Sequence, residues 1–96
     1  MPMETIRNYV PPSTGDLAKL KEKLRMNGDQ MAELAAVAGA NQWRKYTGGN
    51  EPRSVGPHML FWIASRLVLS EEAFAEVLDE MREIGASFDF GERSSS

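Results

Sequence analysis

A segment of small residues followed by a tryptophan most constrains what this chain can fold into. Residues 35–49 read AAVAGANQWRKYTGG. The first six residues are four alanines, one valine and one glycine. Such small side chains let two helices approach closely across a short turn. Trp43 then stands among two amides and two cations, before a pair of glycines ends the segment. We therefore predict two short helices joined by a tight turn at Ala38 and Gly39.

Apolar residues recur at helical spacing along the remaining chain. Leu17, Leu20 and Leu24 show this period in the first half, and Phe74 and Leu78 show it in the second. No window alternates apolar and polar residues as a half-buried strand does. The predicted fold class is therefore all-α, a compact bundle of about five short helices. The predicted helices are about 14–26, about 29–36, 40–47, one from Pro57 through HMLFWIASRL, and one between the cap Ser70 and the stop Gly85.

Capping signals mark the ends of these helices. Ser13 followed by Asp16 predicts a capping box at the start of the first helix. The pair Asn27 and Gly28 is predicted to stop that helix, and Asp29 is predicted to cap the next one. The fourth helix is apolar on nearly all sides, and a helix of that kind is central in its domain or covered by a partner.

The chain is predicted to hold one domain with an extension at each end. Its 96 residues suit a single hydrophobic core. Residues 1–12 contain three prolines and no apolar period, which predicts a flexible N-terminal arm. Residues 87–96 are predicted to form a flexible tail, with Phe88 and Phe90 as the groups that can dock back. The helix-turn-helix domain with its C-terminal helix is expected to span 13–86.

Charge is distributed unevenly along the chain. The formal net charge is -3, yet residues 1–57 carry eight basic and six acidic side chains. Residues 58–96 carry three basic and eight acidic ones. A local basic face can bind phosphate while an acidic remainder keeps a protein soluble, so the net charge alone does not exclude a nucleic-acid partner.

The composition excludes several classes of chemistry. Cysteine is absent, which rules out disulfides and thiolate catalysis, and His58 is the only histidine, with no second ligand set for zinc. No carboxylate pair, Ser/His arrangement or phosphate-cradling glycine loop is present. We therefore expect no enzyme, no metal or other cofactor, and no small-molecule ligand. The absence of an apolar leader and of a long apolar run predicts a cytoplasmic protein outside the membrane.

Helical geometry sorts the side chains of 40–47 into two faces. When Trp43 points inward, Tyr46 shares its face and four polar side chains turn to solvent. Asparagine and glutamine can bond the adenine edge in two places, arginine can do the same to guanine, and lysine can meet guanine or phosphate. An ordinary solvated face is the alternative to a DNA-contacting one. The four side chains are Asn41, Gln42, Arg44 and Lys45.

Four motifs in this region follow a familiar order. They are Met31-Ala32, Ala36-Val37-Ala38, Trp43, and the run from Tyr46 to Gly49. With them, residues 16–67 resemble the phage repressor and Cro-like family of helix-turn-helix proteins, often called the XRE type. That family has Leu-Ala, Gly-Val-Ser, an apolar residue and Trp-Glu-x-Gly in these places. Here the stretch from Val37 to Trp43 is one residue longer, and Gly28 replaces the glutamine that commonly opens the first helix of the motif.

The resemblance implies a lambda-repressor-like fold and a sequence-specific DNA-binding transcriptional regulator of the repressor kind. Helix 40–47 would be the recognition helix in the major groove, and the loop after it would follow the phosphate backbone. It also implies a homodimer on an inverted repeat of double-stranded DNA, held by the last two helices or the Phe88–Phe90 tail. The implied DNA-contacting residues are Asn41, Gln42, Arg44, Lys45, Asn50, Arg53, Ser54 and Gln30.

Two other functions fit the same sequence. The apolar fourth helix and the acidic fifth helix would suit a small protein-interaction module of the antitoxin or phage-inhibitor type. A DNA-bending accessory factor would share the basic face without choosing a sequence. Selection of binding sites from random DNA separates the three, because only a regulator recovers a recurring palindrome.

Overall fold

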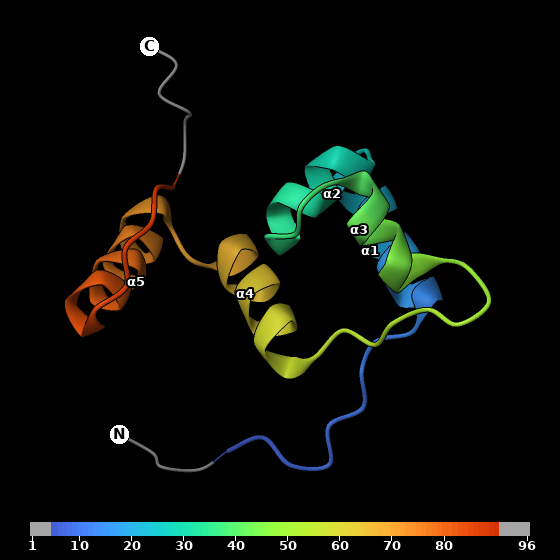
Figure 1. The fold of residues 1–96 in the computed structure, drawn as a ribbon, viewed down its shortest axis with the longest axis horizontal. Coiled ribbons are helices and arrows are strands. Elements are labelled where there is room, and N and C mark those ends of the chain that lie inside the picture. The colour runs from blue at the N-terminus through green and yellow to red at the C-terminus, as the bar shows by residue number, and fades with distance from the viewer. Residues whose placement is uncertain (1–4, 91–96) are drawn as a thin grey trace. The chain divides into compact units, whose positions relative to one another are not determined.

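The computed structural model describes residues 5–90 and is all-helical, without a strand, over that range (Figure 1). The predicted all-α class is therefore confirmed. Within the same residues, no helix is both long and apolar enough to cross a membrane. The helices are α1 (Thr14–Leu24), α2 (Gly28–Ala35), α3 (Ala40–Thr47), α4 (Pro57–Val68) and α5 (Glu71–Ile84).

The chain divides into two units, which are described separately. The first unit ends at Ala64 and the second begins at Ser65, so the border falls inside α4. The first unit holds α1, α2, α3 and most of α4, and the second holds the last turn of α4, α5 and the segment that follows. The outermost parts of the predicted arm and tail, residues 1–4 and 91–96, lie outside the described residues.

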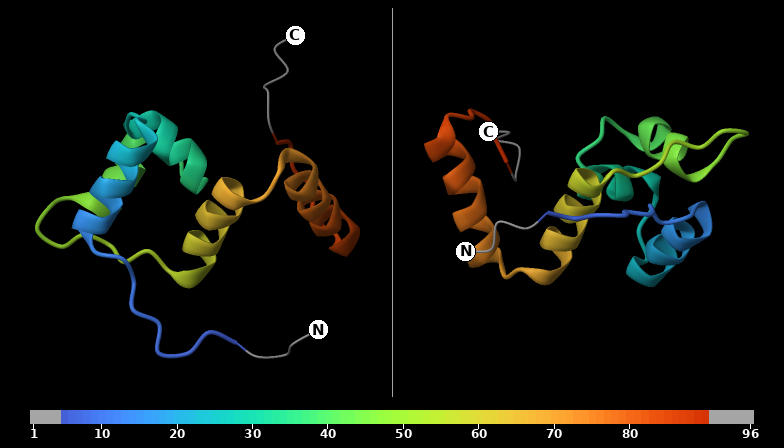
Figure 2. Two further views of the ribbon diagram at one scale, coloured as in Figure 1. Left: turned by 180° about the vertical axis from the view of Figure 1, so that it is seen from behind. Right: turned by 90° about the horizontal axis from the view of Figure 1, so that it is seen from below.

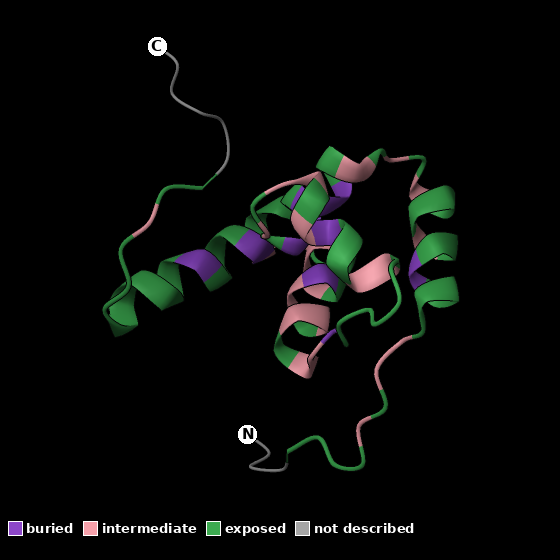
Figure 3. Cartoon of the chain, turned by 45° about the vertical axis from the view of Figure 1, so that its right-hand side comes forward, coloured by how far each residue is buried: buried purple, intermediate pink, exposed green. Residues whose placement is uncertain are grey.

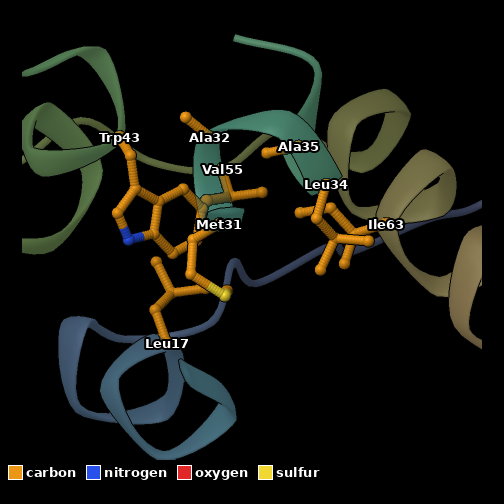
Figure 4. Packing of buried hydrophobic residues seen from close by; sticks show 8 residues of the cluster. All are labelled: Leu17, Met31, Ala32, Leu34, Ala35, Trp43, Val55 and Ile63. Carbon is orange, nitrogen blue, oxygen red and sulfur yellow. The ribbon is translucent and has the colours of Figure 1, made fainter. Parts of the chain in front are cut away.

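The core of the first unit forms around Trp43 of α3. Its indole is buried against a cluster that draws residues from four helices and the loop before α4 (Figure 4). α2 supplies four of these residues, whereas α1, α3 and α4 supply one each. Burial of each of the larger aliphatic side chains in this cluster contributes about 1.5–3 kcal/mol to the stability of the unit. Its members are Leu17, Met31, Ala32, Leu34, Ala35, Trp43, Val55 and Ile63.

The predicted capping box of α1 is confirmed. The Asp16 backbone N–H donates to Ser13 Oγ at 3.0 Å, and the Ser13 N–H donates to Asp16 Oδ2 at 2.9 Å. This second bond stabilises the carboxylate and holds the pKa of Asp16 below its ordinary value of 3.8. The predicted end of the helix at residue 26 is wrong, because Arg25 adopts a left-handed conformation (φ 57°) and closes α1 after Leu24.

The cap predicted for α2 is also wrong. Asn27, not Asp29, is the N-cap, and α2 begins at Gly28. The Gln30 N–H donates to Asn27 Oδ1 and the Asn27 N–H donates to Gln30 Oε1, each at 2.8 Å. These reciprocal bonds form a capping box from two amides, which satisfies two otherwise unpaired N–H groups at the start of the helix.

A short turn connects α2 to α3. Ala36 ends α2 in a left-handed conformation (φ 62°), and the Val37 N–H donates to the Ala32 carbonyl at 2.9 Å. This pairing closes the last turn of α2 in the manner of a Schellman motif. Glycine is the usual residue at such a position, because alanine is strained there by its Cβ.

The second unit has a small buried set. Ser70 caps α5 by accepting from the Ala73 N–H at 3.0 Å, and Gly85 ends it with φ +132°, as the sequence predicts. Only Phe74 and Leu78 of α5 are buried. The tail docks on its own unit. The Phe90 ring lies 5.5 Å from that of Phe74 and 5.1 Å beneath the Arg66 guanidinium, and Arg82 lies 4.3 Å over Phe88.

Candidate nucleic-acid interface

α3 packs against both α1 and α2, and views from behind and from below show the three helices grouped together (Figure 2). Trp43 is 2% exposed and is the one buried residue of α3. Ala40, Tyr46 and Thr47 are half-buried around it, as the helical wheel predicts. The inward position of the tryptophan is therefore confirmed, and it fixes which side of α3 is left open.

The start of α3 is held by α2 instead of by its own cap. Gly39 precedes the helix and has no side chain to accept a hydrogen bond, but Asp29 Oδ1 accepts from the Ala40 N–H at 3.3 Å. A Cβ built on Gly28 would lie 3.2 Å from the Ala40 Cβ, so the first turns of the two helices nearly touch. Asp29 thus caps the helix after the one predicted for it, across eleven residues of sequence.

The outer face of α3 carries the predicted polar set, with one difference. Asn41, Arg44 and Lys45 are exposed, whereas Gln42 is half-buried. Gln42 lies in the first turn, where it borders a shallow hollow shared with Asp29 and residues 38–41. Gln42 is therefore less exposed than the wheel predicts, because the first turn of α3 lies close to α2.

Arg44 and Asn41 form a hydrogen-bonded pair one turn apart. Arg44 Nη2 donates to Asn41 Oδ1, and both side chains are exposed. Within the pair, the amide oxygen is engaged by the guanidinium. The Asn41 amino group and the remaining guanidinium N–H groups are donors only. The pair thus presents donors outward, a pattern suited to acceptor groups.

The loop between α3 and α4 is fastened at two points on either side of Ser54. The Arg53 N–H donates to the Lys45 carbonyl at 2.7 Å, which places the loop against the end of α3. Val55 is buried, and its carbonyl accepts from the Tyr9 hydroxyl at 2.6 Å. Asn50, Arg53 and Ser54 are exposed. The predicted loop candidates therefore stand open on a backbone that is anchored to α3 and to the arm.

Tyr9 is a contributor that sequence reasoning missed. It lies 46 positions from the carbonyl that it binds, in a segment predicted to be a flexible arm. Pro11 and Pro12, which follow it in sequence, are half-buried. The aromatic side chain in an otherwise polar segment is the signal that could have indicated a docking point.

Gln30 caps its own helix, α2. Its side-chain oxygen accepts from the Asn27 N–H in the capping box of α2, although the residue itself is exposed. Its position is therefore explained by helix capping. We define the α3 surface, without Gln30, as Asn41, Gln42, Arg44, Lys45, Asn50, Arg53 and Ser54.

The α3 surface contains three cations, and Glu51 is the one carboxylate in its loop. In residues 5–90 no cluster of histidine, aspartate or glutamate could hold a metal ion. Comparison with protein-family models, curated proteins and solved structures found no match to this chain. The ligand of the α3 surface is therefore inferred from the charges and hydrogen-bonding groups of its side chains.

Proposed function

We propose that this chain is a sequence-specific DNA-binding transcriptional regulator that places α3 in the major groove. The observation that carries the proposal is the burial of Trp43, which leaves Asn41, Arg44 and Lys45 on the open side of a helix. The major groove admits one α-helix, and these residue types bond base edges and phosphates. The anchored loop holds Arg53 and Ser54 beside the end of α3, where they suit the phosphate backbone.

The Asn41–Arg44 pair favours guanine as the contacted base. A two-point contact to adenine uses the Asn41 oxygen as an acceptor, and Arg44 already occupies one of the two lone pairs of that oxygen. Guanine offers two acceptors, O6 and N7, to the outward donors of the pair. Selected sites are therefore expected to carry guanine at the position that Asn41 and Arg44 reach.

The proposed regulator acts as a homodimer on an inverted repeat. Two recognition helices meet successive major grooves when a dimer spaces them about 34 Å apart. With about three phosphate contacts per protomer, affinity should fall steeply as salt rises, since bound counterions are released. Sedimentation that shows a monomer at tens of micromolar, both with and without its selected duplex, would remove the dimer from the proposal.

Selection of binding sites from random duplexes tests the proposed function. The wild-type chain is expected to recover a recurring palindrome. Arg44→Ala and Gln42→Ala should relax its sequence preference, whereas Arg53→Ala should weaken all sequences alike. Lys21→Ala is the matched control, because Lys21 is an exposed cation of α1 outside the α3 surface.

The outcomes of this selection are distinct. If the three α3-surface variants bind the selected site as the wild type does, α3 is not the recognition helix. Bending of DNA without a recovered sequence would support the accessory-factor function in place of a regulator. If no duplex binds, the DNA-binding proposal is contradicted.

A further inference from the structure

α5 exposes an apolar row that its own unit leaves uncovered. Val77, Met81 and Ile84 recur at helical spacing and are 42%, 36% and 79% exposed. They lie beside the buried pair Phe74 and Leu78 on the helix, so the apolar surface of α5 is wider than the part it buries. Figure 3 shows the exposed length of this helix, which precedes the C-terminal trace.

A row of carboxylates runs beside the apolar row. Glu76, Glu80 and Glu83 precede its three members by one residue each, so the carboxylate row runs parallel to the apolar row, about 100° around α5 from it. All three are exposed. The ion pair between Arg82 and Asp79, at 3.1 Å, involves none of the three. The carboxylates thus offer a line of negative charge to a partner.

A second copy of the chain does not complement this surface. In an antiparallel pair of helices, the same flank of each helix faces its counterpart, so the two carboxylate rows would meet and repel. In a parallel pair, the row would face the Phe74 and Leu78 flank, on which α5 carries a single cation, four residues after Leu78. Arg82, the one cation of α5, is already paired with Asp79 and stacked on Phe88.

We infer that the α5 rows, Val77, Met81 and Ile84 with Glu76, Glu80 and Glu83, are a docking surface for a basic amphipathic helix of another protein. Such a helix places apolar side chains on the exposed row and lysine or arginine along the carboxylates, so that two amphipathic helices pair face to face. The surface belongs to the second unit alone and does not depend on the proposed DNA contact of α3. Charge complementarity therefore sets the chemistry of the partner.

Titration of the full chain with a synthetic helical peptide tests this inference. The probe is about 18 residues long, with leucines at helical spacing and lysines elsewhere, and its control carries glutamates in place of the lysines. Isothermal calorimetry should show binding of the lysine peptide alone, weakened by added salt because the charges are screened. Equal binding of both peptides, or of neither, would overturn the inference.

Two pairs of variants locate the peptide on α5. Glu76→Gln with Glu80→Gln should weaken binding about threefold to tenfold, since two surface ion pairs are lost. The control, Glu22→Gln with Glu51→Gln, makes the same charge change in the first unit and should leave binding unchanged. Ile84→Ser should weaken binding about tenfold. Val68→Ser is its control, because Val68 on α4 is as exposed as Ile84.

The variants also test whether the peptide binds elsewhere on the chain and whether a second copy of the chain occupies the surface. If each control lowers the affinity for the peptide as much as its test variant does, the peptide does not bind α5 and the inference is wrong. Sedimentation of wild type and Ile84→Ser checks for a second copy. A dimer that the substitution dissociates would assign the row to self-association and overturn the inference. Loss of helical circular dichroism is not expected in any variant, since all the substituted residues are exposed.

Discussion

α2 and α3 have the same length, eight residues, but opposite relations to the core. α2 buries Met31, Ala32, Leu34 and Ala35, whereas α3 buries Trp43 alone. α2 also closes its own start with two amides, whereas α3 takes its first acceptor from Asp29. One helix is built into the core, and the other is held at the surface by one large side chain and a neighbour's carboxylate.

The difference shows how a short helix can be kept rigid and still be largely open. A single buried tryptophan supplies as much apolar contact as several small residues, so three polar side chains of α3 stay exposed. The cap from Asp29 fixes the first turn without placing a side chain on the outer face. A helix supported in this way suits a surface that must meet a partner.

Removal of Trp43, the single buried anchor of α3, should have the largest effect on stability. Trp43→Ala is expected to lower the unfolding free energy by about 3–5 kcal/mol, because the cavity adds to the lost burial. That loss is comparable to the whole stability of a small domain, so α3 should not survive it. Urea unfolding followed by circular dichroism measures the change. Trp43→Phe, which keeps an aromatic ring, should cost less; an equal cost would show that aromatic burial is not what holds α3.

Loss of the Asp29 cap should have a smaller effect, and it should act on α3 and not on α2. Asp29→Ala is expected to lower stability by about 1 kcal/mol, since the Ala40 N–H loses its acceptor. Hydrogen exchange should quicken at the first turn of α3 and stay slow in α2, which has its own capping box. Asp29→Asn keeps an acceptor oxygen and serves as the control. Faster exchange in α2 instead of α3 would show that Asp29 caps α2 and not α3.

Relief of the strained turn should stabilise the pair. Ala36 has φ 62°, where glycine is free of the clash that alanine meets. Ala36→Gly is therefore expected to raise stability by about 1 kcal/mol and the melting temperature by several degrees. Ala38→Gly, in the same turn without a positive φ, should be neutral or destabilising. The prediction fails if the two substitutions change the melting temperature alike.

The smallest expected effect contrasts the caps of α1 and α2. The Asp16 carboxylate accepts from the Ser13 N–H, and its pKa is lowered in the folded chain. The stabilisation is therefore complete above the ordinary pKa of 3.8 and is lost as pH falls through the lower folded value. Asp16→Asn should flatten the acid limb of the stability curve. The Asn27–Gln30 box has no titratable group, so Gln30→Ala, which removes the acceptor of the Asn27 N–H, should lower stability by a similar amount at every pH.

Periodicity predicted the local features of this fold well. The five helices, the capping box at Ser13 and the inward Trp43 follow from patterns within one or two turns of sequence, and the structure confirms them. What could not be predicted are contacts across space. Asp29 reaches α3 through the close approach at Gly28, and Tyr9 reaches Val55 from a segment without any period.

In the candidate site, too, local features could be predicted and contacts between helices could not. The exposure of Asn41, Arg44 and Lys45 could be predicted from the wheel, because one inward residue sets every other direction on a helix. The half-burial of Gln42 could not, since it depends on how closely α2 approaches α3. Likewise, the role of Gln30 in the α2 cap follows from where that helix begins, which a pattern locates only to within a residue or two.

The most direct measurement of the central claim is an amide NMR titration of the full chain with a short duplex recovered by selection. The shifted amides are expected to belong to α3 and to the loop at Asn50, Arg53 and Ser54, and added salt should reverse the shifts. Shifts confined to α5, or a spectrum that the duplex leaves unchanged, would contradict the claim that the open side of α3 binds DNA.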